Sequence, residues 1–275
     1  MDYLHEDYKG EELLKNKDKA FISGYALGRD YHKVMKKKLQ KLVDMIKIKI
    51  PAQGRVFVDS GPVLEKALAE KSGLGWIGKN TLLLNKKRGS FFFLGEIYTN
   101  LNLPLDKVDE KNHCGSCKAC IDICPTKAIV GPKKLDARKC ISYLTIEYKG
   151  SIEEELRPMM GNRIFGCDDC QLVCPWNKFA QFTQEEDFKP RHNLNNSGLS
   201  ELFKWTEENY LKKTKGSPIR RAGYESWSRN IAVALGNADT SKEVYESLMS
   251  RRNDPSAIVR EHVKWALDQH KGKSS

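Results

Sequence analysis

The sequence predicts a three-part α+β protein, made of an α/β domain, a cysteine-rich insert and an all-α C-terminal region. Three observations predict it. Strand-like and helix-like segments alternate over about the first hundred residues, all eight cysteines lie between Cys114 and Cys174, and only helical periodicity follows them. We therefore divide the chain into a polar lead-in over residues 1–20, the α/β domain over 21–111, the insert over 112–178 and the helical region over 179–275.

The first helix is expected between Asp30 and Ile50, after a charged lead-in that we expect to be frayed. Apolar residues recur at helical spacing with lysines between them, and Pro51 ends the helix. The apolar positions are Val34, Met35, Leu39, Leu42, Val43, Ile46 and Ile50. We interpret this helix as amphipathic, with a basic face that is either solvated or in contact with RNA.

A short strand from Arg55 to Asp59 and a helix ending near Ser72 are expected next. Ser60 can cap this helix and Pro62 suits its first turn. The glycine-rich segment 73–80 matches no dinucleotide or phosphate-loop fingerprint, so it is either a plain turn or a loop that lets a ligand approach closely. Residues 81–84 and 90–99 are predicted as two more strands, joined by a turn over 85–89.

The cysteine spacing predicts two iron–sulfur clusters. Cys114, Cys117, Cys120 and Cys124 form C-x2-C-x2-C-x3-C followed by Pro125. This is the bacterial ferredoxin run, in which the fourth cysteine serves the other of two [4Fe–4S] clusters. The second run, C-x2-C-x3-C-P, lacks its first cysteine, and Cys140 is the only cysteine left to replace it. We assign cluster one to Cys114, Cys117, Cys120 and Cys174, and cluster two to Cys124, Cys140, Cys167 and Cys170.

The alternative for these cysteines is a pair of structural zinc sites, because C-x2-C pairs also suit four-cysteine zinc. Zinc sites rarely use three cysteines at successive x2 spacing followed by x3 and proline, so the pattern favours iron–sulfur. A disulfide framework is not expected in an intracellular chain of this size.

Four helices are expected in the C-terminal region, over 200–212, 217–236, 242–251 and 256–269. Pairs of such helices are typical of HEAT-type repeats, but one and a half units also fit a plain helical cap.

Composition narrows the location and the partners. No apolar run of 18 residues and no secretory signal is present, so we expect a cytoplasmic protein without membrane spans. Lys and Arg number 47 against 36 Asp and Glu, a formal charge of +11. Such a charge favours polyanions such as nucleic acid, although basic proteins without RNA partners are common.

Several motifs together resemble the epoxyqueuosine reductase family, and the resemblance runs from residue 21 nearly to the end. They are GYALGRDYH at 24–32, VDSGP at 58–62, EKSGLGWIGK at 70–79, GSFFFLGE at 89–96, LDARKCISYLTIE at 135–147, GNRIFGCDDCQ at 161–171, CPWN at 174–177, IRR at 219–221 and NIAVALGN at 230–237. The family usually has a further segment before the first motif, so we expect an N-terminally shortened α/β domain here.

The resemblance implies a cobalamin-binding α/β domain beside two [4Fe–4S] clusters, with a helical C-terminal region that holds tRNA. It implies reduction of epoxyqueuosine, at the wobble position of a tRNA with a GUN anticodon, to queuosine. Partners would be this tRNA and an external low-potential electron donor, and a monomer fits so large a substrate. The chemistry needs electrons that no side chain supplies, so a cofactor must carry them.

Asp59 is our candidate proton donor, because the departing epoxide oxygen needs a general acid. The resemblance gives its counterpart that role, and we expect burial against the flat cofactor to raise its pKa. The alternative is that Asp59 or Ser60 only caps the following helix. The implied cobalamin contacts are Asp59, Ser60, Trp76, Lys79, Asn80, Leu83, Leu94 and Arg163; the candidate tRNA contacts are Arg157, Arg163, Lys215, Arg220 and Arg221.

His32 is not expected to bind cobalt. Asp30-Tyr31-His32 begins like the D-x-H-x-x-G cobalt motif, but Met35 stands where the glycine belongs, so base-off cobalamin without a protein histidine is predicted. Two other functions remain open: a ferredoxin-like electron carrier without catalysis, and a cobalamin-dependent reductase of a small molecule such as an organohalide.

Overall fold

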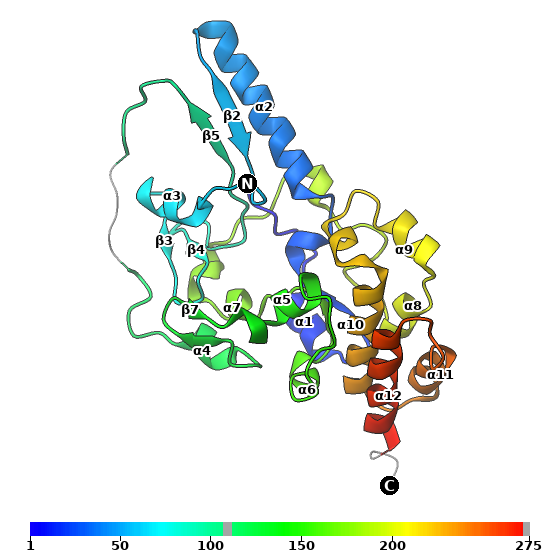
Figure 1. The fold of residues 1–275 in the computed structure, drawn as a ribbon. Coiled ribbons are helices and arrows are strands. Elements are labelled where there is room, and N and C mark those ends of the chain that lie inside the picture. The colour runs from blue at the N-terminus through cyan, green and yellow to red at the C-terminus, as the bar shows by residue number, and fades with distance from the viewer. Residues whose placement is uncertain (107–111, 272–275) are drawn as a thin grey trace.

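The computed structural model describes residues 1–106 and 112–271. A long helix and a two-stranded ribbon project from one end of the molecule, and the C-terminal helices lie beside the insert toward the opposite end (Figure 1). The predicted boundary between residues 111 and 112 falls at the end of the segment outside the described residues. No helix in the described part is long and apolar enough to cross a membrane.

The first twenty residues are packed into the protein, so the expectation of a frayed lead-in is wrong. They contain α1 (Gly10–Lys15) and lead into β1 (Phe21–Ile22) and the 3₁₀ helix η1 (Gly24–Ala26). Tyr3 is 6% exposed and packs on the rings of Phe91 and Phe93. An isolated bridge between Asp2 and Phe92 extends the contact. Aromatic burial by these few residues outweighs the high charge around them.

The long helix α2 (Tyr31–Lys49) forms where the sequence predicts it. The Asp30 side chain accepts a hydrogen bond from the backbone N–H of His32 and caps the N-terminus. Only the first half of the apolar stripe and Val43 are buried, whereas Leu42, Met45 and Ile48 are exposed. The helix packs on β2 (Gly54–Phe57), which pairs antiparallel with β5 (Glu96–Thr99).

The expected pairing of strands and the expected start of the next helix both need correction. The helix α3 (Glu65–Lys71) begins at Glu65 without a side-chain cap, so neither Ser60 nor Pro62 starts it. The strand β4 (Leu83–Leu84) pairs with β3 (Trp76–Ile77) and not with the 90–99 segment. In the described part the strands form four two-stranded sheets, so the domain is mixed α/β without a layered parallel sheet.

The insert consists of short elements around the cysteines. They are α4 (Ala119–Ile123), β6 (Ile129–Gly131), β7 (Lys134–Leu135), η2 (Ala137–Lys139), α5 (Ile141–Ile146), α6 (Arg157–Met160), β8 (Arg163–Phe165), α7 (Asp169–Leu172) and η3 (Pro175–Phe179). The helices α4 and α7, each within one cysteine run, pack together. Strand β8 pairs parallel with β1, which ties the insert to the N-terminal part.

The C-terminal region is helical as predicted, with two changes. The expected 200–212 helix is divided into α8 (Leu199–Phe203) and α9 (Glu207–Lys213), because the Thr206 side chain caps a new helix. The helix expected from residue 217 begins as the 3₁₀ helix η5 (Pro218–Ala222) before α10 (Gly223–Asn237). The remaining elements are η4 (Glu186–Phe188), α11 (Lys242–Ser250) and α12 (Ala257–Lys271).

The main core lies where α10 and α12 pack together and α10 meets the insert. At Gly236 a Cβ would approach the Cα of Ala266 to 3.0 Å, so only glycine allows this close packing. Arg229 is fully buried and donates to the carbonyl oxygens of Leu144 at 2.6 Å and Gly150 at 2.7 Å. These bonds join α10 to α5 and to the loop that follows α5.

Candidate active site

Two cavities in the insert are each walled by one of the predicted cysteine quartets. A cavity of about 370 Å³ is lined by Cys114, Cys117, Cys120 and Cys174. A second cavity, of about 390 Å³, is lined by Cys124, Cys140, Cys167 and Cys170. The structure therefore divides the eight cysteines as the crossover rule predicts.

The surroundings of these thiols fit iron–sulfur clusters. Burial, followed by the charges of Cys174 and Cys114, raises the pKa of Cys120, and burial likewise raises the pKa of Cys170. Crowded thiolates of this kind need cations among them, which the irons of a cluster supply. Among residues 1–106 and 112–271, no three metal-ligating side chains lie close enough to bind one metal ion. The thiolates of a [4Fe–4S] cluster are farther apart than this, because each one binds a different iron.

Two of the residues assigned to cobalamin instead lie against the cluster-one loop. The Lys79 ammonium donates to the carbonyl oxygens of Gly115 at 2.7 Å and Cys117 at 2.8 Å. Trp76 is buried edge-on against the rings of His113 and Trp176. The glycine-rich segment 73–80 thus positions the loop that carries the first cysteines.

Two arginines assigned to tRNA are unavailable for phosphate, which corrects the prediction. Arg157 is 1% exposed, donates to the carbonyl oxygen of Ile152 at 2.8 Å and pairs with Glu261. Arg163 pairs with Asp169, which also accepts from the Cys167 thiol at 2.8 Å. Arg163 therefore lies beside the cluster-two cysteines. It is not placed to bind an RNA phosphate, and it does not line the cavity next to Asp59.

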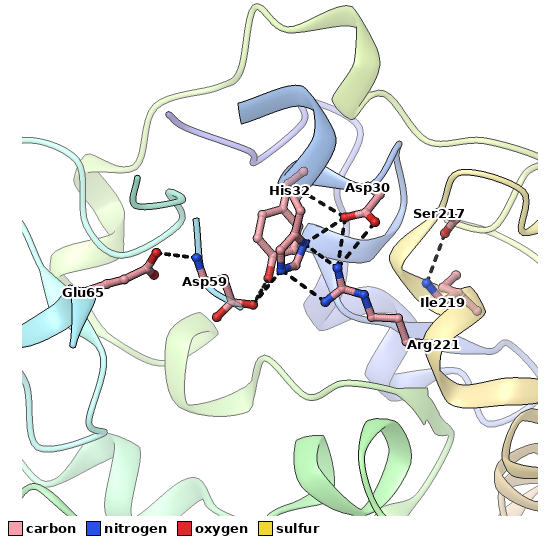
Figure 2. A network of polar contacts seen from close by, with 8 residues as sticks. Asp30, His32, Asp59, Glu65, Ser217, Ile219 and Arg221 are labelled. Atoms are coloured by element: carbon pink, nitrogen blue, oxygen red, sulfur yellow. Dashed lines mark hydrogen bonds and ion pairs between the residues drawn. The ribbon is translucent and has the colours of Figure 1, made fainter. Parts of the chain in front are cut away.

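Asp59 belongs to a polar network that gathers segments distant in sequence (Figure 2). Its Oδ2 accepts from the Tyr31 hydroxyl at 2.6 Å and lies 3.0 Å from Nε2 of His32. The other ring nitrogen of His32, Nδ1, lies 2.8 Å from Oδ1 of Asp30. Arg221, from η5, places its guanidinium nitrogens 2.7 Å from Nδ1 and 3.2 Å from Nε2.

The backbone at Asp59 is unusual and excludes the capping role. Its φ is +47°, a left-handed conformation that is uncommon for a non-glycine residue and is often found at functional sites. Its N–H donates to the Glu65 side chain, so Glu65, at the start of α3, holds the loop. Asp59 is thus displayed by a short loop between β2 and α3 and caps no helix.

The neighbours of Asp59 stabilise its ionised form. The hydrogen bond with His32 lowers the pKa of Asp59 below its ordinary value, against the raising effect of burial, and the Tyr31 hydroxyl adds to the lowering. For His32, burial opposes the charge, but the hydrogen bonds to Asp30 and Asp59 raise its pKa overall. The protein alone therefore lowers the pKa of Asp59, and the raised pKa that we predict depends on burial against the cofactor.

The Asp59 side chain faces a small cavity with an apolar wall. The cavity is about 170 Å³ and is lined by Tyr31, Asp59, Glu65, Lys66, Leu82, Leu83, Ser90, Phe92, Phe93 and Leu94. Five of these, Tyr31, Leu82, Ser90, Phe92 and Phe93, also line the cluster-two cavity. The cavity next to Asp59 and the cluster-two cavity therefore share one wall.

The residues around Asp59 fit cobalamin as one wall of its site. Leu83 and Leu94, two predicted contacts, line this cavity, whereas Asn80 lines both cluster cavities and Ser60 is exposed. A cavity of about 170 Å³ is smaller than the roughly 300–1,000 Å³ of enclosed ligand pockets. Both ring nitrogens of His32 face carboxylates, so His32 is not placed as a cobalt ligand.

A basic groove lies on the other side of Asp30, between the start of α2 and the end of α9. It measures about 630 Å³ and is lined by Arg29, Asp30, Lys33, Val34, Lys37, Asp187, Arg191, His192, Lys212, Lys215 and Gly216. Its carboxylates are engaged: Asp187 pairs with Arg29 at 2.8 Å, and Asp30 contacts His32. Of the predicted tRNA contacts, only Lys215 lines it; Arg220 donates to the carbonyl oxygen of Leu211, and Arg221 belongs to the Asp59 network.

Sequence reasoning missed four features of the site. Three are the pairing of His32 with two aspartates, the hydrogen bond by which Glu65 holds the Asp59 loop, and the basic groove. The Asp30–His32 spacing at a helix start was visible, but their approach to Asp59 and Arg221 depends on tertiary structure. A fourth feature, Tyr8, donates to the buried Asp168 at 2.5 Å between two cluster-two ligands.

Two family models match this chain, one in the cysteine-rich insert and one in the N-terminal part. Residues 113–177 match the family model described as "4Fe-4S double cluster binding domain". Residues 1–60 match the one described as "Epoxyqueuosine reductase QueG, DUF1730". The second match begins at residue 1, so it includes the first twenty residues, which the sequence analysis set apart as a lead-in.

Curated relatives and solved structures agree with these matches. The epoxyqueuosine reductase of Pseudomonas aeruginosa is 60% identical over 271 residues, covering 98% of this chain and 75% of the relative. That of Escherichia coli is 54% identical over 270 residues, covering 98% and 71%. The crystal structure of an epoxyqueuosine reductase with an epoxyqueuosine-modified tRNA-Tyr stem loop superposes with a TM-score of 0.88 at 30% identity, covering 98% and 71%.

A second solved structure bears on the Asp59 loop. It is the Bacillus subtilis epoxyqueuosine reductase, described with a catalytic aspartate loop swung out of the active site, with a TM-score of 0.86 at 30% identity, covering 98% of this chain and 71% of that one.

Proposed function

Because this chain belongs to the epoxyqueuosine reductase family and is an oxidoreductase that reduces epoxyqueuosine in tRNA, we propose that electrons reach the epoxide through cluster one, then cluster two, then cobalamin. The observation that carries this order is the wall shared by the cluster-two cavity and the Asp59 cavity. Tyr31, Phe92 and Phe93 line both. A carrier at cluster two is therefore next to the place where a substrate would meet Asp59.

Electrons enter at cluster one in this proposal. Cys117 is exposed, whereas the other seven cysteines are partly covered. An external low-potential donor can thus approach cluster one closely while cluster two remains inside. The chain acts as a monomer here, because all eight thiols come from one chain.

Cobalamin would lie against the apolar wall of Leu82, Leu83, Phe92, Phe93 and Leu94, and when bound it supplies an electron pair at low potential to the substrate carbon. The apolar wall would exclude water from the reacting centre. This chain spans about three-quarters of the length of these curated relatives.

Asp59 is the proton donor of the proposal. Its carboxyl group points into the cavity, is oriented by Tyr31 and His32, and sits on a loop held by Glu65. The oxygen released from the epoxide becomes strongly basic, and a carboxyl group at that position can protonate it. The loop displacement described for the Bacillus subtilis relative supports a mobile Asp59 loop here.

The tRNA backbone would lie in the basic groove. Lys33, Lys37, Lys212 and Lys215 are exposed and line it, and the groove reaches the Asp59 network through Asp30. Phosphates provide the sequence-independent part of RNA binding, and lysines and arginines of this kind neutralise them. The groove replaces the buried Arg157 and the paired Arg163 as the predicted phosphate contact.

The test is anaerobic turnover with Asp59→Asn after loading with iron, sulfide and cobalamin. Asparagine still accepts from Tyr31 but holds no transferable proton, so kcat should fall by about 10²–10⁴-fold. The Kd for tRNA and the cluster absorbance should be unchanged. Asp106→Asn, an exposed change outside the site, is the matched control. Undiminished turnover by Asp59→Asn would remove Asp59 from the mechanism.

A further inference from the structure

We propose that His32 stores the proton that Asp59 delivers to the substrate oxygen, and that the pair is reloaded from water for the second proton of the turnover. This rests on the proposed function, in which Asp59 faces the substrate oxygen. Asp59 is then the catalytic residue, and His32 is a positioning residue that acts through it.

The stoichiometry of the reaction requires such a store. Converting the epoxide to an alkene breaks two C–O bonds, forms the second bond of a C=C double bond, consumes two electrons and two protons, and releases the oxygen as water. The external low-potential donor supplies the electrons. One carboxyl group carries one proton, so Asp59 must be reloaded before the second C–O bond breaks.

The geometry makes His32 the group that loads Asp59 with a proton. Its Nε2 lies 3.0 Å from Oδ2 of Asp59, the oxygen that also accepts from the Tyr31 hydroxyl. Its Nδ1 lies 2.8 Å from Asp30. His32 is 5% exposed, which limits direct exchange of its proton with bulk water. A histidine between two carboxylates holds a proton and donates it along one defined direction.

The charges around His32 set where the proton rests. Asp30, Asp59 and the more distant Glu65 are negative and favour the protonated His32 ring. Burial and the positive charge of Arg221 oppose it. The other titratable groups nearby, the hydroxyls of Tyr31 and Tyr25, are neutral. The balance raises the pKa of His32 and lowers the pKa of Asp59. In the resting pair a single shared proton is therefore on His32, and it passes to Asp59 as Asp59 gives a proton to the substrate oxygen, so that His32 and Asp59 relay one proton at a time.

Arg221 links this store to RNA binding. Its guanidinium can only donate, so it competes with the imidazolium for Asp30, from which its Nη2 lies 3.5 Å. Its side chain is 44% exposed and comes from η5, in the helical region. A substrate phosphate that attracts Arg221 would remove a positive charge from His32 and strengthen its hold on the proton.

The direct test is the titration of His32 by NMR, which needs no turnover. The chain has six histidines, and the resonance lost in His32→Gln assigns the signal. We expect its pKa to lie above the ordinary value of about 6.5, to fall in Asp30→Asn and to rise in Arg221→Gln. A His32 that titrates below the ordinary value, or that is unaffected by both substitutions, overturns the proposal.

Turnover gives the second test. Glutamine at position 32 can still donate a hydrogen bond to Asp59 but cannot carry a proton. In His32→Gln we expect kcat to fall by about 10²-fold or more, KM for tRNA to be unchanged, the defect to grow as pH rises, and added imidazole to restore part of the rate. A kcat within twofold of wild type, or a loss equal at every pH without imidazole rescue, contradicts a proton store. If wild type itself converts no epoxyqueuosine, the proposed function fails, and the titration still judges the His32–Asp59 pair.

Discussion

The basic groove allows a quantitative prediction about tRNA binding. Six cations line it, and one of them, Arg29, is offset by Asp187 at 2.8 Å, which leaves five to meet phosphates. Each neutralised phosphate of a duplex contributes about 0.9 to the slope of log Kobs against log salt, so the wild-type slope should be about −4.5. Replacing Lys33 and Lys212 by glutamine removes two exposed cations that have no ion-pair partner among the described residues.

The assay is fluorescence anisotropy of a labelled anticodon stem loop between about 50 and 300 mM salt. The double variant should reduce the slope by about 2. Lys15→Gln/Lys47→Gln changes the net charge equally at exposed residues that do not line the groove, so its slope should match wild type. Equal slopes for both double variants would refute the groove as the phosphate contact and leave only long-range attraction.

Three further predictions concern the packed N-terminus, a carboxyl pair and the cluster ligands. Tyr8→Phe removes a hydrogen bond to the buried Asp168 carboxylate, so unfolding should be easier by about 2 kcal/mol and Tm lower by about 3–4 °C. The control is Tyr245→Phe, which changes an exposed tyrosine. Equal Tm values for the two variants would show that the N-terminal segment adds no stability through this bond. Burial and the charge of Glu65 raise the pKa of Glu96 to about 7, so its folded form binds the extra proton and stability should decrease as pH rises from about 4.5 to about 7. Glu96→Gln should flatten this dependence in Tm measurements, and an unchanged profile contradicts the assignment. Cys124→Ser should lower iron from about eight to about four per chain and stop turnover, whereas loss of all iron would show that the two clusters do not assemble separately.

The sequence predicts two cysteine quartets and a double-cluster domain, because most of the cysteine spacing is local. Both quartets, including the lone Cys140, line separate cavities as expected. The helix α2 and most C-terminal helices were likewise predicted from periodicity over many residues. Family motifs located the function, which composition alone left open.

The errors arose where tertiary contacts decide. Arg157 and Arg163 appear in the sequence as free cations, but Glu261 and Asp169 pair with them in the fold. Tyr3 and Tyr8 lie among charged residues, yet their rings and hydroxyls are used by partners more than 80 residues away. The lowered pKa of Asp59 depends on His32 from another element, which no local pattern of sequence reveals.

The most direct test of the central claim is the mass of the wobble nucleoside in epoxyqueuosine-containing tRNA after anaerobic incubation with this chain, both clusters loaded, cobalamin added and a low-potential reductant supplied. The account predicts the loss of one oxygen atom, with two electrons consumed per tRNA, and no loss when cobalamin is left out or Cys124 is replaced by serine. Loss of the oxygen without cobalamin, or its retention by fully loaded protein that binds the tRNA, would contradict it.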